Sequence, residues 1–354
     1  LGGASYGREG VHSAEVIGVA GVEKTFDERL RSPSASADPL KLSIDLTIQA
    51  AVENVLASGM LLLDAKGAAA VLMDVNNGEI ISLSSLPDFD PNHRPKLPTS
   101  GDPANSPLFN RAIQGVYELG STFKIFAIAQ ALELNIVSPE TLINVSGPLS
   151  WGKFKIRDYH NYGSELPVKK VISKSSNIGT ARIAREIGSA NQQKFLKSLG
   201  FFDTVPLEMV EASGGKPLLP KKWSELSTMT ISYGHGLSAT PLHLAAAYAS
   251  IGNGGYKVTP TLQIQENYKY GDRVISEMVS KQALSMLRSV VTDGTATMAE
   301  VPGYPVAGKT GTADKPSPTG RYYDDKVITN FAALFPAGNP KYVLVVTMDE
   351  PEDR

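Results

Sequence analysis

Strand-like sequence lies at both ends of the long second part of this chain, and this arrangement limits the folds that it can adopt. Near the start, a hairpin is predicted by "GAAAVLMDVNNGEIISLSSL", because two apolar runs flank "NNG", which can supply positive φ at the turn. At the end, three strands are predicted by "YPVAGKTGTA", "VITNFAALFPA" and "PKYVLVVTMDE". The pattern predicts one mixed sheet built from both ends of the domain, with a helical middle.

The sequence between these strands is predicted to be helical. Helical patterns cover residues 121–135 and 168–200, and glycine ends a further helix in "TPLHLAAAYASIGNGG". Another helix is predicted by "SKQALSMLRSVV", and a strand-like start followed by a helix by "LKLSIDLTIQAAVENVLASGMLLL".

The first 40 residues have a different texture. They are rich in Gly, Ser and Ala and end in "RSPSASADP", which predicts poorly packed sequence followed by a linker. We therefore expect an N-terminal segment over residues 1–40 and one large domain over residues 41–354.

Composition excludes several classes of function. The net charge of the 354 residues is -2, so nothing indicates a nucleic-acid or polybasic membrane-binding surface. The chain has no cysteine, which excludes disulfides, thiolate zinc sites and cysteine nucleophiles. Its five histidines lack ligand spacing, so no metal site is expected. No apolar run reaches the roughly 18 residues of a membrane span.

The first candidate motif is "GSTFK", which places Ser121 and Lys124 on one face of a predicted helix. Gly120 allows close backbone approach, and a helix N-terminus favours an oxyanion at Ser121. A lysine amine within reach can take the serine proton, which is the arrangement of an activated nucleophile. Ser-x-x-Lys is also common by chance, and Ser150–Lys153 and Ser213–Lys216 repeat it in loop-like sequence.

The second candidate motif is "SSN", which ends with Asn177 and precedes another predicted helix. The hydroxyl of Ser175 and the amide of Asn177 can point into one cleft from a loop. Helix capping is the alternative explanation, since Ser and Asn are both good caps.

The third candidate motif is "GKTGTA" on a predicted strand. Lys309 and Gly311 then face one side of the strand, and Thr310 and Thr312 face the other. Gly311 leaves room for a ligand along the strand edge. The alternative is an edge strand with a protective lysine.

The three motifs in this order are far more specific than any one of them. They are the set found in β-lactamases and penicillin-binding proteins. The chain resembles class B penicillin-binding proteins over roughly residues 12–350, most closely the division-specific type of Gram-negative bacteria. The resemblance is carried by "GVEKTFDERL", "IDLTIQAAVENVL", "GEIISLSSLPDFDPN", "NRAIQGVYELGSTFK", "SSNIGTARIA", "YGHGLSATPLHLAAAYASIGNGG" and "AGKTGTADK".

The resemblance implies an α/β fold of the α+β type, in which helices and an all-α lobe flank a five-stranded antiparallel sheet. It implies a serine D,D-transpeptidase that crosslinks peptidoglycan stem peptides through an acyl-enzyme and is inhibited by β-lactams. Ser121 matches the nucleophile and Lys124 the general base. Such a lysine needs a pKa about 3 units below its usual value, worth roughly 4 kcal/mol. Apolar surroundings and the charge of Lys309 would act in that direction.

The remaining matches concern proton transfer and substrate binding. Ser175 matches the proton shuttle to the leaving amine, and Asn177 matches the side chain that holds the donor amide. Lys309 matches the residue that supports the shuttle electrostatically. Thr310 and Thr312, with Gly311 between them, match positions that bind the terminal carboxylate. The family requires no metal or cofactor.

Other functions stay open at this point. A β-lactamase shares the three motifs and adds a carboxylate that activates water, for which Glu211 and Glu225 are candidates. A non-catalytic penicillin-binding sensor or division scaffold is the alternative outside enzymes. "GASYG" near the start fits an α/β-hydrolase motif but has no strand before it.

The resemblance also sets expectations for the whole protein. Residues 1–40 match a remnant of the family's non-catalytic pedestal, and residues 41–354 match the transpeptidase domain with its last helix missing. The family is anchored in the inner membrane by an N-terminal helix, with the catalytic domain in the periplasm. Expected partners are stem peptides, β-lactams and division-complex membrane proteins.

Overall fold

The structure is a computed structural model that describes residues 2–6, 16–33, 39–317 and 321–352. Its centre is one five-stranded sheet whose strand order is β11-β12-β13-β3-β4, with every neighbouring pair antiparallel. The strands are β3 (Gly67–Asp74), β4 (Ile80–Leu86), β11 (Ala307–Pro316), β12 (Tyr322–Phe335) and β13 (Tyr342–Asp349).

Both ends of the domain therefore build one sheet, as the strand pattern predicts. β13, near the end of the chain, pairs with β3, and this joins the two sets of strands. The expectation of a mixed sheet is wrong, because all pairs are antiparallel, as the family resemblance implied. The hairpin between β3 and β4 turns at Gly78, whose φ of 76° is the positive value expected for "NNG".

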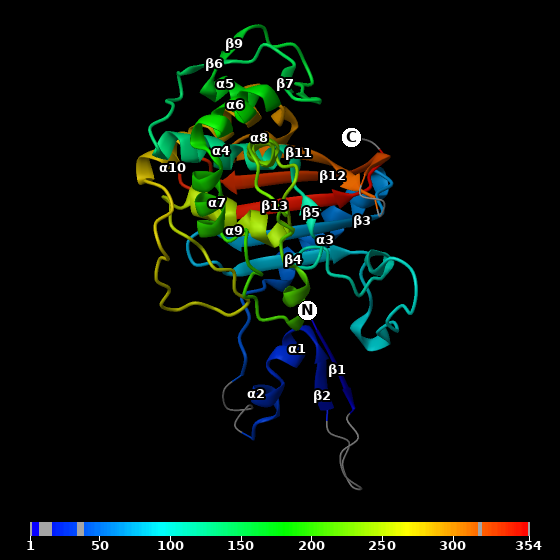
Figure 1. Cartoon of the computed structure of the whole chain (residues 1–354). Coiled ribbons are helices and arrows are strands. Elements are labelled where there is room, and N and C mark those ends of the chain that lie inside the picture. The colour runs from blue at the N-terminus through cyan, green and yellow to red at the C-terminus, as the bar shows by residue number, and fades with distance from the viewer. Residues whose placement is uncertain (1, 7–15, 34–38, 318–320, 353–354) are drawn as a thin grey trace.

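Helices cover both faces of the sheet, and further helices form a lobe beside its β11 edge (Figure 1). On one face, α9 packs against the central strands and α10 against β11; on the other, α3 packs against β3 and β4. The sheet and lobe helices are α3 (Leu46–Leu62), α4 (Lys124–Glu133), α5 (Val168–Ser173), α6 (Asn177–Ile187), α7 (Ser189–Ser198), α8 (Glu225–Ser232), α9 (Pro241–Gly252) and α10 (Glu277–Asp293).

Alternating residues of β3 divide the core into two layers. Ala69 and Val71 belong to the main cluster with α9, while Ala68 and Ala70 pack with Leu56 of α3. This alternation follows from the two-residue period of a strand, and it explains why β3 is apolar at almost every position. The fold class predicted from the resemblance is thus confirmed.

The predicted helical stretch 168–200 is divided into three helices. α5 ends at Ser173, and Ser175 then takes a positive φ of 61° before α6 begins. Gly188, with φ 78°, separates α6 from α7. The first break is what places the second motif in a turn.

Short elements complete the fold. They include three small strand pairs: β5 (Tyr117–Glu118) with β10 (Ser238–Ala239), β6 (Leu142–Asn144) with β9 (Glu165–Pro167), and β7 (Leu149–Trp151) with β8 (Phe154–Ile156). The 3₁₀ turns are η1 (Pro91–His93), η2 (Pro103–Asn105), η3 (Gly120–Phe123), η4 (Val210–Gly214) and η5 (Thr297–Ala299).

The N-terminal segment is more regular than the composition suggested. β1 (Gly2–Tyr6) pairs with β2 (Val16–Ala20), and α1 (Gly21–Thr25) and α2 (Asp27–Arg31) follow beyond the β4 edge of the sheet (Figure 1). Val22 is buried in the main core, so this segment packs on the large domain. Part of the predicted linker, residues 34–38, lies outside the described residues.

Candidate active site

The first motif begins in a 3₁₀ turn that lies directly against strand β11. Gly120 has a φ of 58°, and a Cβ atom there would come within 2.4 Å of the Thr312 carbonyl oxygen. On the opposite side of the contact, a Cβ atom on Gly311 would come within 2.5 Å of the Leu119 carbonyl oxygen. Two glycines therefore permit the approach that brings Ser121 next to the third motif.

Lys124 is the first residue of α4 and its side chain is fully buried. Its Nζ donates to the carbonyl oxygen of Ser175 at 2.5 Å and to the Ser175 hydroxyl at 2.9 Å. Burial holds the pKa of Lys124 well below its usual value, and the charge of Lys309 lowers it further, while Asp158 opposes both effects. The sequence predicted a lowered pKa for Lys124, caused by apolar surroundings and by the charge of Lys309, and this environment agrees with both causes.

The second motif lies in the turn between α5 and α6. The helix cap is Ser176, whose Oγ accepts from the Gly179 N–H at 2.9 Å and donates to Asp158 at 2.6 Å. Asn177 is the first residue of α6, and its Nδ2 donates to the Arg157 carbonyl oxygen at 3.0 Å. Capping therefore falls to Ser176, and the hydroxyl of Ser175 is left to contact Lys124.

The third motif lies on β11, at the edge of the sheet nearest the lobe. Lys309 and Gly311 are buried, Thr310 is half-buried and Thr312 is exposed, which follows the alternation predicted for a strand. Lys309 Nζ donates to the Thr310 carbonyl oxygen at 3.0 Å. Burial lowers the pKa of Lys309 to about 7.

The structure brings all three motifs together. η3 contacts β11, Lys124 joins α4 to the turn at Ser175, and Lys309 acts on Lys124 through its charge. The other Ser-x-x-Lys matches are placed differently: Ser150 lies on the short strand β7 and Ser213 in the turn η4. Neither pair lies on an α-helix with a buried lysine.

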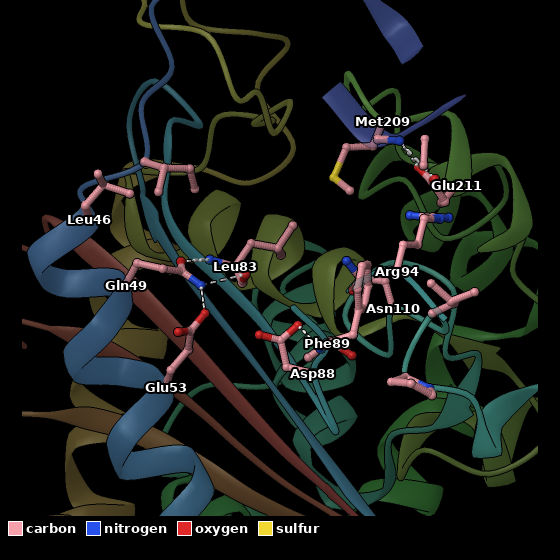
Figure 2. A pocket seen from close by; sticks show the side chains of 16 residues that line it. Leu46, Gln49, Glu53, Leu83, Asp88, Phe89, Arg94, Asn110, Met209 and Glu211 are labelled. Carbon is pink, nitrogen blue, oxygen red and sulfur yellow. Dashed lines mark hydrogen bonds between the residues drawn. The ribbon is translucent and has the colours of Figure 1, made fainter. Parts of the chain in front are cut away.

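The two candidates for the water-activating carboxylate of a β-lactamase are engaged elsewhere. Both oxygens of Glu211 accept from the Gly21 N–H, at 3.0 and 3.1 Å, in the contact with the N-terminal segment. Glu211 lines a separate pocket of about 290 Å³ together with Met209 and Arg94 (Figure 2). Glu225 pairs with Arg185 at 2.9 Å on the surface. Neither carboxylate hydrogen-bonds to a motif residue within the described chain.

The position of Ser5 does not fit the α/β-hydrolase alternative. Ser5 lies within strand β1 and pairs with Ile17, whereas a nucleophile elbow needs its serine at a turn between a strand and a helix. Gly7, the last residue of that motif, lies outside the described residues.

Two polar residues near the motifs were not singled out from the sequence. Asp158 accepts from Ser176 and from the Ile178 N–H at 3.0 Å, so one carboxylate holds both neighbours of Asn177. Glu118, three residues before Ser121, is buried and contacts the Tyr322 hydroxyl, the His235 ring and the Gly236 N–H. "YELGSTFK" and "RDYHNYG" contain them, but no local pattern says which distant groups an acid will meet.

Within the described ranges, no group of three or more His, Cys, Asp or Glu side chains could hold a metal ion. In the same ranges, no helix combines the length and apolar character that crossing a membrane requires.

Comparison with known proteins agrees with this geometry. Residues 68–354 match the family model of the penicillin-binding protein transpeptidase domain. The chain is 33% identical to the probable peptidoglycan D,D-transpeptidase FtsI of Caulobacter vibrioides, covering 95% of this chain and 57% of the relative. It is 32% identical to the peptidoglycan D,D-transpeptidase FtsI of Escherichia coli K12, covering 97% of this chain and 61% of the relative. The chain thus spans about three fifths of these relatives.

Solved structures show the same similarity. The apo transpeptidase domain of Burkholderia pseudomallei penicillin-binding protein 3 superposes with a TM-score of 0.78 at 33% identity, covering 89% of each chain. Penicillin-binding protein 3 from Mycobacterium tuberculosis, solved with aztreonam, gives a TM-score of 0.78 at 28% identity, covering 88% of this chain and 73% of that one. These matches confirm the resemblance read from the sequence.

Proposed function

The chain belongs to the penicillin-binding protein transpeptidase family, within the class B, penicillin-binding protein 3 type, and we propose that it crosslinks peptidoglycan stem peptides during septal wall synthesis. The observation that carries this proposal is the buried lysine of the first motif, 2.9 Å from the serine of the second. A cationic lysine is costly in such a place, so the site favours the neutral amine that a general base needs.

In the proposed mechanism, Ser121 attacks the carbonyl carbon between two D-alanines of a donor stem. Lys124, in its neutral form, takes the hydroxyl proton as the bond forms. Ser175, which already contacts Lys124, passes a proton to the leaving amine, and the terminal D-alanine departs. The amine of a neighbouring stem then attacks the ester carbonyl at Ser121 and releases the crosslinked product with a free Ser121 hydroxyl.

The remaining motif residues would bind the donor peptide and stabilise the charge that develops during the reaction. The backbone N–H groups of Ser121 and Thr312 would form the oxyanion hole, which is supported by the close contact of Gly120 with Thr312. Thr310 and Thr312 would hold the terminal carboxylate, while Gly311 between them lets η3 approach the strand. Asn177 would hold the donor amide, and the cationic form of Lys309 would support proton transfer through Ser175.

The same family membership suggests the wider setting. We assign residues 1–40 to a remnant of the pedestal domain and residues 41–354 to the transpeptidase domain. An N-terminal membrane anchor, a periplasmic catalytic domain and membrane partners of the division complex are proposed for the whole protein. β-Lactams are proposed to acylate Ser121, because they resemble the terminal dipeptide of the donor.

Intact-protein mass after addition of a penicillin tests the proposal, with Ser121→Ala alongside. We expect one adduct that persists for hours on the wild type and is absent from the variant. Rapid loss of the adduct with drug turnover would instead indicate a β-lactamase. Release of D-alanine from a stem-peptide mimic separates a transpeptidase from a slowly deacylating sensor. An adduct on Ser121→Ala would exclude Ser121 as the nucleophile.

A further inference from the structure

A buried carboxylate that the mechanism does not use lies three residues before the nucleophile. The Glu118 side chain is 7% exposed and accepts the Gly236 N–H at 2.7 Å. The Tyr322 hydroxyl lies 2.9 and 3.0 Å from its two oxygens, and His235 Nδ1 lies 3.1 Å from Oε2. Within the described residues, neither lysine nor arginine pairs with Glu118, so its donors are hydroxyl, imidazole and backbone groups.

The donors to Glu118 come from two walls of the site. Tyr322 is the first residue of β12 and pairs with Pro316, at the far end of the strand that carries Lys309. His235 and Gly236 follow Gly234, whose carbonyl oxygen accepts the Gly120 N–H at 3.3 Å. One carboxylate thus joins the residues before Ser121, the loop 233–236 and the β11–β12 hairpin.

Burial and Glu118 together raise the pKa of two nearby tyrosines. Burial and the charge of Glu118 raise the pKa of Tyr233 to about 12. The pKa of Tyr322 is raised by burial first, and then by the charge and the hydrogen bond of Glu118. Both hydroxyls are therefore protonated at neutral pH, and Tyr322 donates to the carboxylate.

We propose that Glu118 is a positioning residue that holds the β11–β12 hairpin and the loop 233–236 at the distance from Ser121 that acylation requires. The inference rests on the proposed function. The two N–H groups assigned to the oxyanion hole belong to different elements, one to η3 and one to β11. Small displacements of reacting groups are costly, and about 1 Å can cost roughly 100-fold in rate. A clasp between the two elements therefore acts on the acylation step.

The test separates binding from acylation in Glu118→Gln and Tyr322→Phe. A carboxamide keeps the size of Glu118 but has one accepting oxygen for three donors, and Tyr322→Phe removes only the hydroxyl. We expect the acylation rate constant of a chromogenic penicillin to fall about 10- to 100-fold in Glu118→Gln. The dissociation constant of the initial complex should change less than about threefold. In the double variant, Tyr322→Phe should lower the acylation rate constant little beyond Glu118→Gln alone, because both substitutions remove the same contact.

Glu208→Gln is the matched control. Glu208 also accepts a backbone N–H, from Leu262 at 2.9 Å, and a hydroxyl, from Thr261 at 2.6 Å, but it joins segments outside the motifs. Its substitution should leave the acylation rate constant unchanged. Acylation of all variants is measured at a temperature well below their unfolding midpoints. A purely structural role of Glu118 would then lower the midpoint temperature but leave the acylation rate constant unchanged.

The outcomes are distinct. Wild-type acylation rates in both Glu118→Gln and Tyr322→Phe would overturn the inference while leaving the proposed function intact. If Glu118→Gln does not fold, a wild-type rate in Tyr322→Phe alone overturns it, and a reduced rate at unchanged affinity supports it. If the wild type forms no adduct, the proposed function fails and the inference fails with it.

Discussion

The Nζ atom of Lys124 lies 2.9 Å from the Ser175 hydroxyl and 2.5 Å from the carbonyl oxygen of the same residue. Ser175 reaches this position with a φ of 61°, which is uncommon for a residue with a side chain. Residues in such conformations cluster at functional sites, where the surrounding structure holds them. The contact joins the first motif to the second.

Ser175 and its neighbour Ser176 should behave differently when each is replaced by alanine. Ser175→Ala removes the hydroxyl that contacts Lys124, so acylation by a penicillin should slow by about 100-fold or more, as expected when a proton-transfer group is lost. Ser176→Ala removes the α6 cap and should cost about 1 kcal/mol of unfolding free energy. Stopped-flow acylation and denaturant unfolding of both variants check this pair. A larger acylation defect in Ser176→Ala would contradict the assignment.

The pH dependence of acylation should report the proton on Lys124. Burial is the main cause of its lowered pKa and the charge of Lys309 is the second. Lys309→Gln removes that charge, so the pKa of Lys124 should rise and the acid limb of the profile should move to higher pH. The overall rate falls as well, since Lys309 belongs to the proposed machinery, but the position of the limb is the readout.

Lys315→Gln serves as the control for this experiment. Lys315 lies on the same strand but binds Asp349 and Glu350, both at 2.7 Å. Its removal should leave the acid limb where it is. Profiles from pH 5 to 9 decide the matter, and a limb that stays in place or moves to lower pH in Lys309→Gln would contradict the electrostatic coupling.

The parts of the fold that the sequence predicted are those set by local patterns. The β3–β4 hairpin follows from two apolar runs around a glycine turn, and the alternation along β11 follows from strand geometry. The three motifs were recognisable because their residue types and order are specific, although nothing local proves that they meet.

What the sequence missed depends on contacts between distant residues. It predicted helix over 168–200 with the second motif in a loop before a helix, but it did not predict the positive φ of Ser175, because that residue contacts Lys124 and no glycine or proline marks the position. The roles of Asp158 and Glu118 were missed for the same reason. Glu118 contacts Tyr322, which lies 204 residues later in the chain, and the sequence around an acidic residue does not identify so distant a partner.

Gly120→Ala should disable the site, whereas Gly152→Ala should not. Both glycines have similar positive φ, 58° and 56°, so alanine costs about 1 to 2 kcal/mol of backbone strain at either position. At Gly120 the new Cβ would also lie 2.4 Å from the Thr312 carbonyl oxygen, while nothing lies within 4 Å at Gly152. Acylation should therefore fall by about 100-fold or more only in Gly120→Ala. Equal acylation in the two variants would mean that the spacing of η3 and β11 is not critical.

His243 should make the folded state less stable in mild acid. It is buried in the N-terminal turn of α9, where Nδ1 accepts from Thr240 and Nε2 donates to the Asp203 carbonyl oxygen at 2.8 Å. Both ring nitrogens of this neutral form are already engaged in hydrogen bonds. Burial lowers the pKa of His243 from 6.5 to about 4.

The unfolded chain takes up a proton on His243 below about pH 6.5 and the folded chain only below about pH 4, so folding stability decreases as the pH falls between these values. The contribution of this group is fully present above pH 6.5, and its complete loss corresponds to about 3 kcal/mol. Denaturant unfolding from pH 7 to 4 measures the slope. His243→Gln keeps a polar side chain at the same position but cannot titrate. Its unfolding free energy should therefore fall less between pH 7 and pH 4 than that of the wild type, by about the same 3 kcal/mol. Parallel slopes for the wild type and His243→Gln would show that His243 gains its proton in the folded protein as readily as in the unfolded chain.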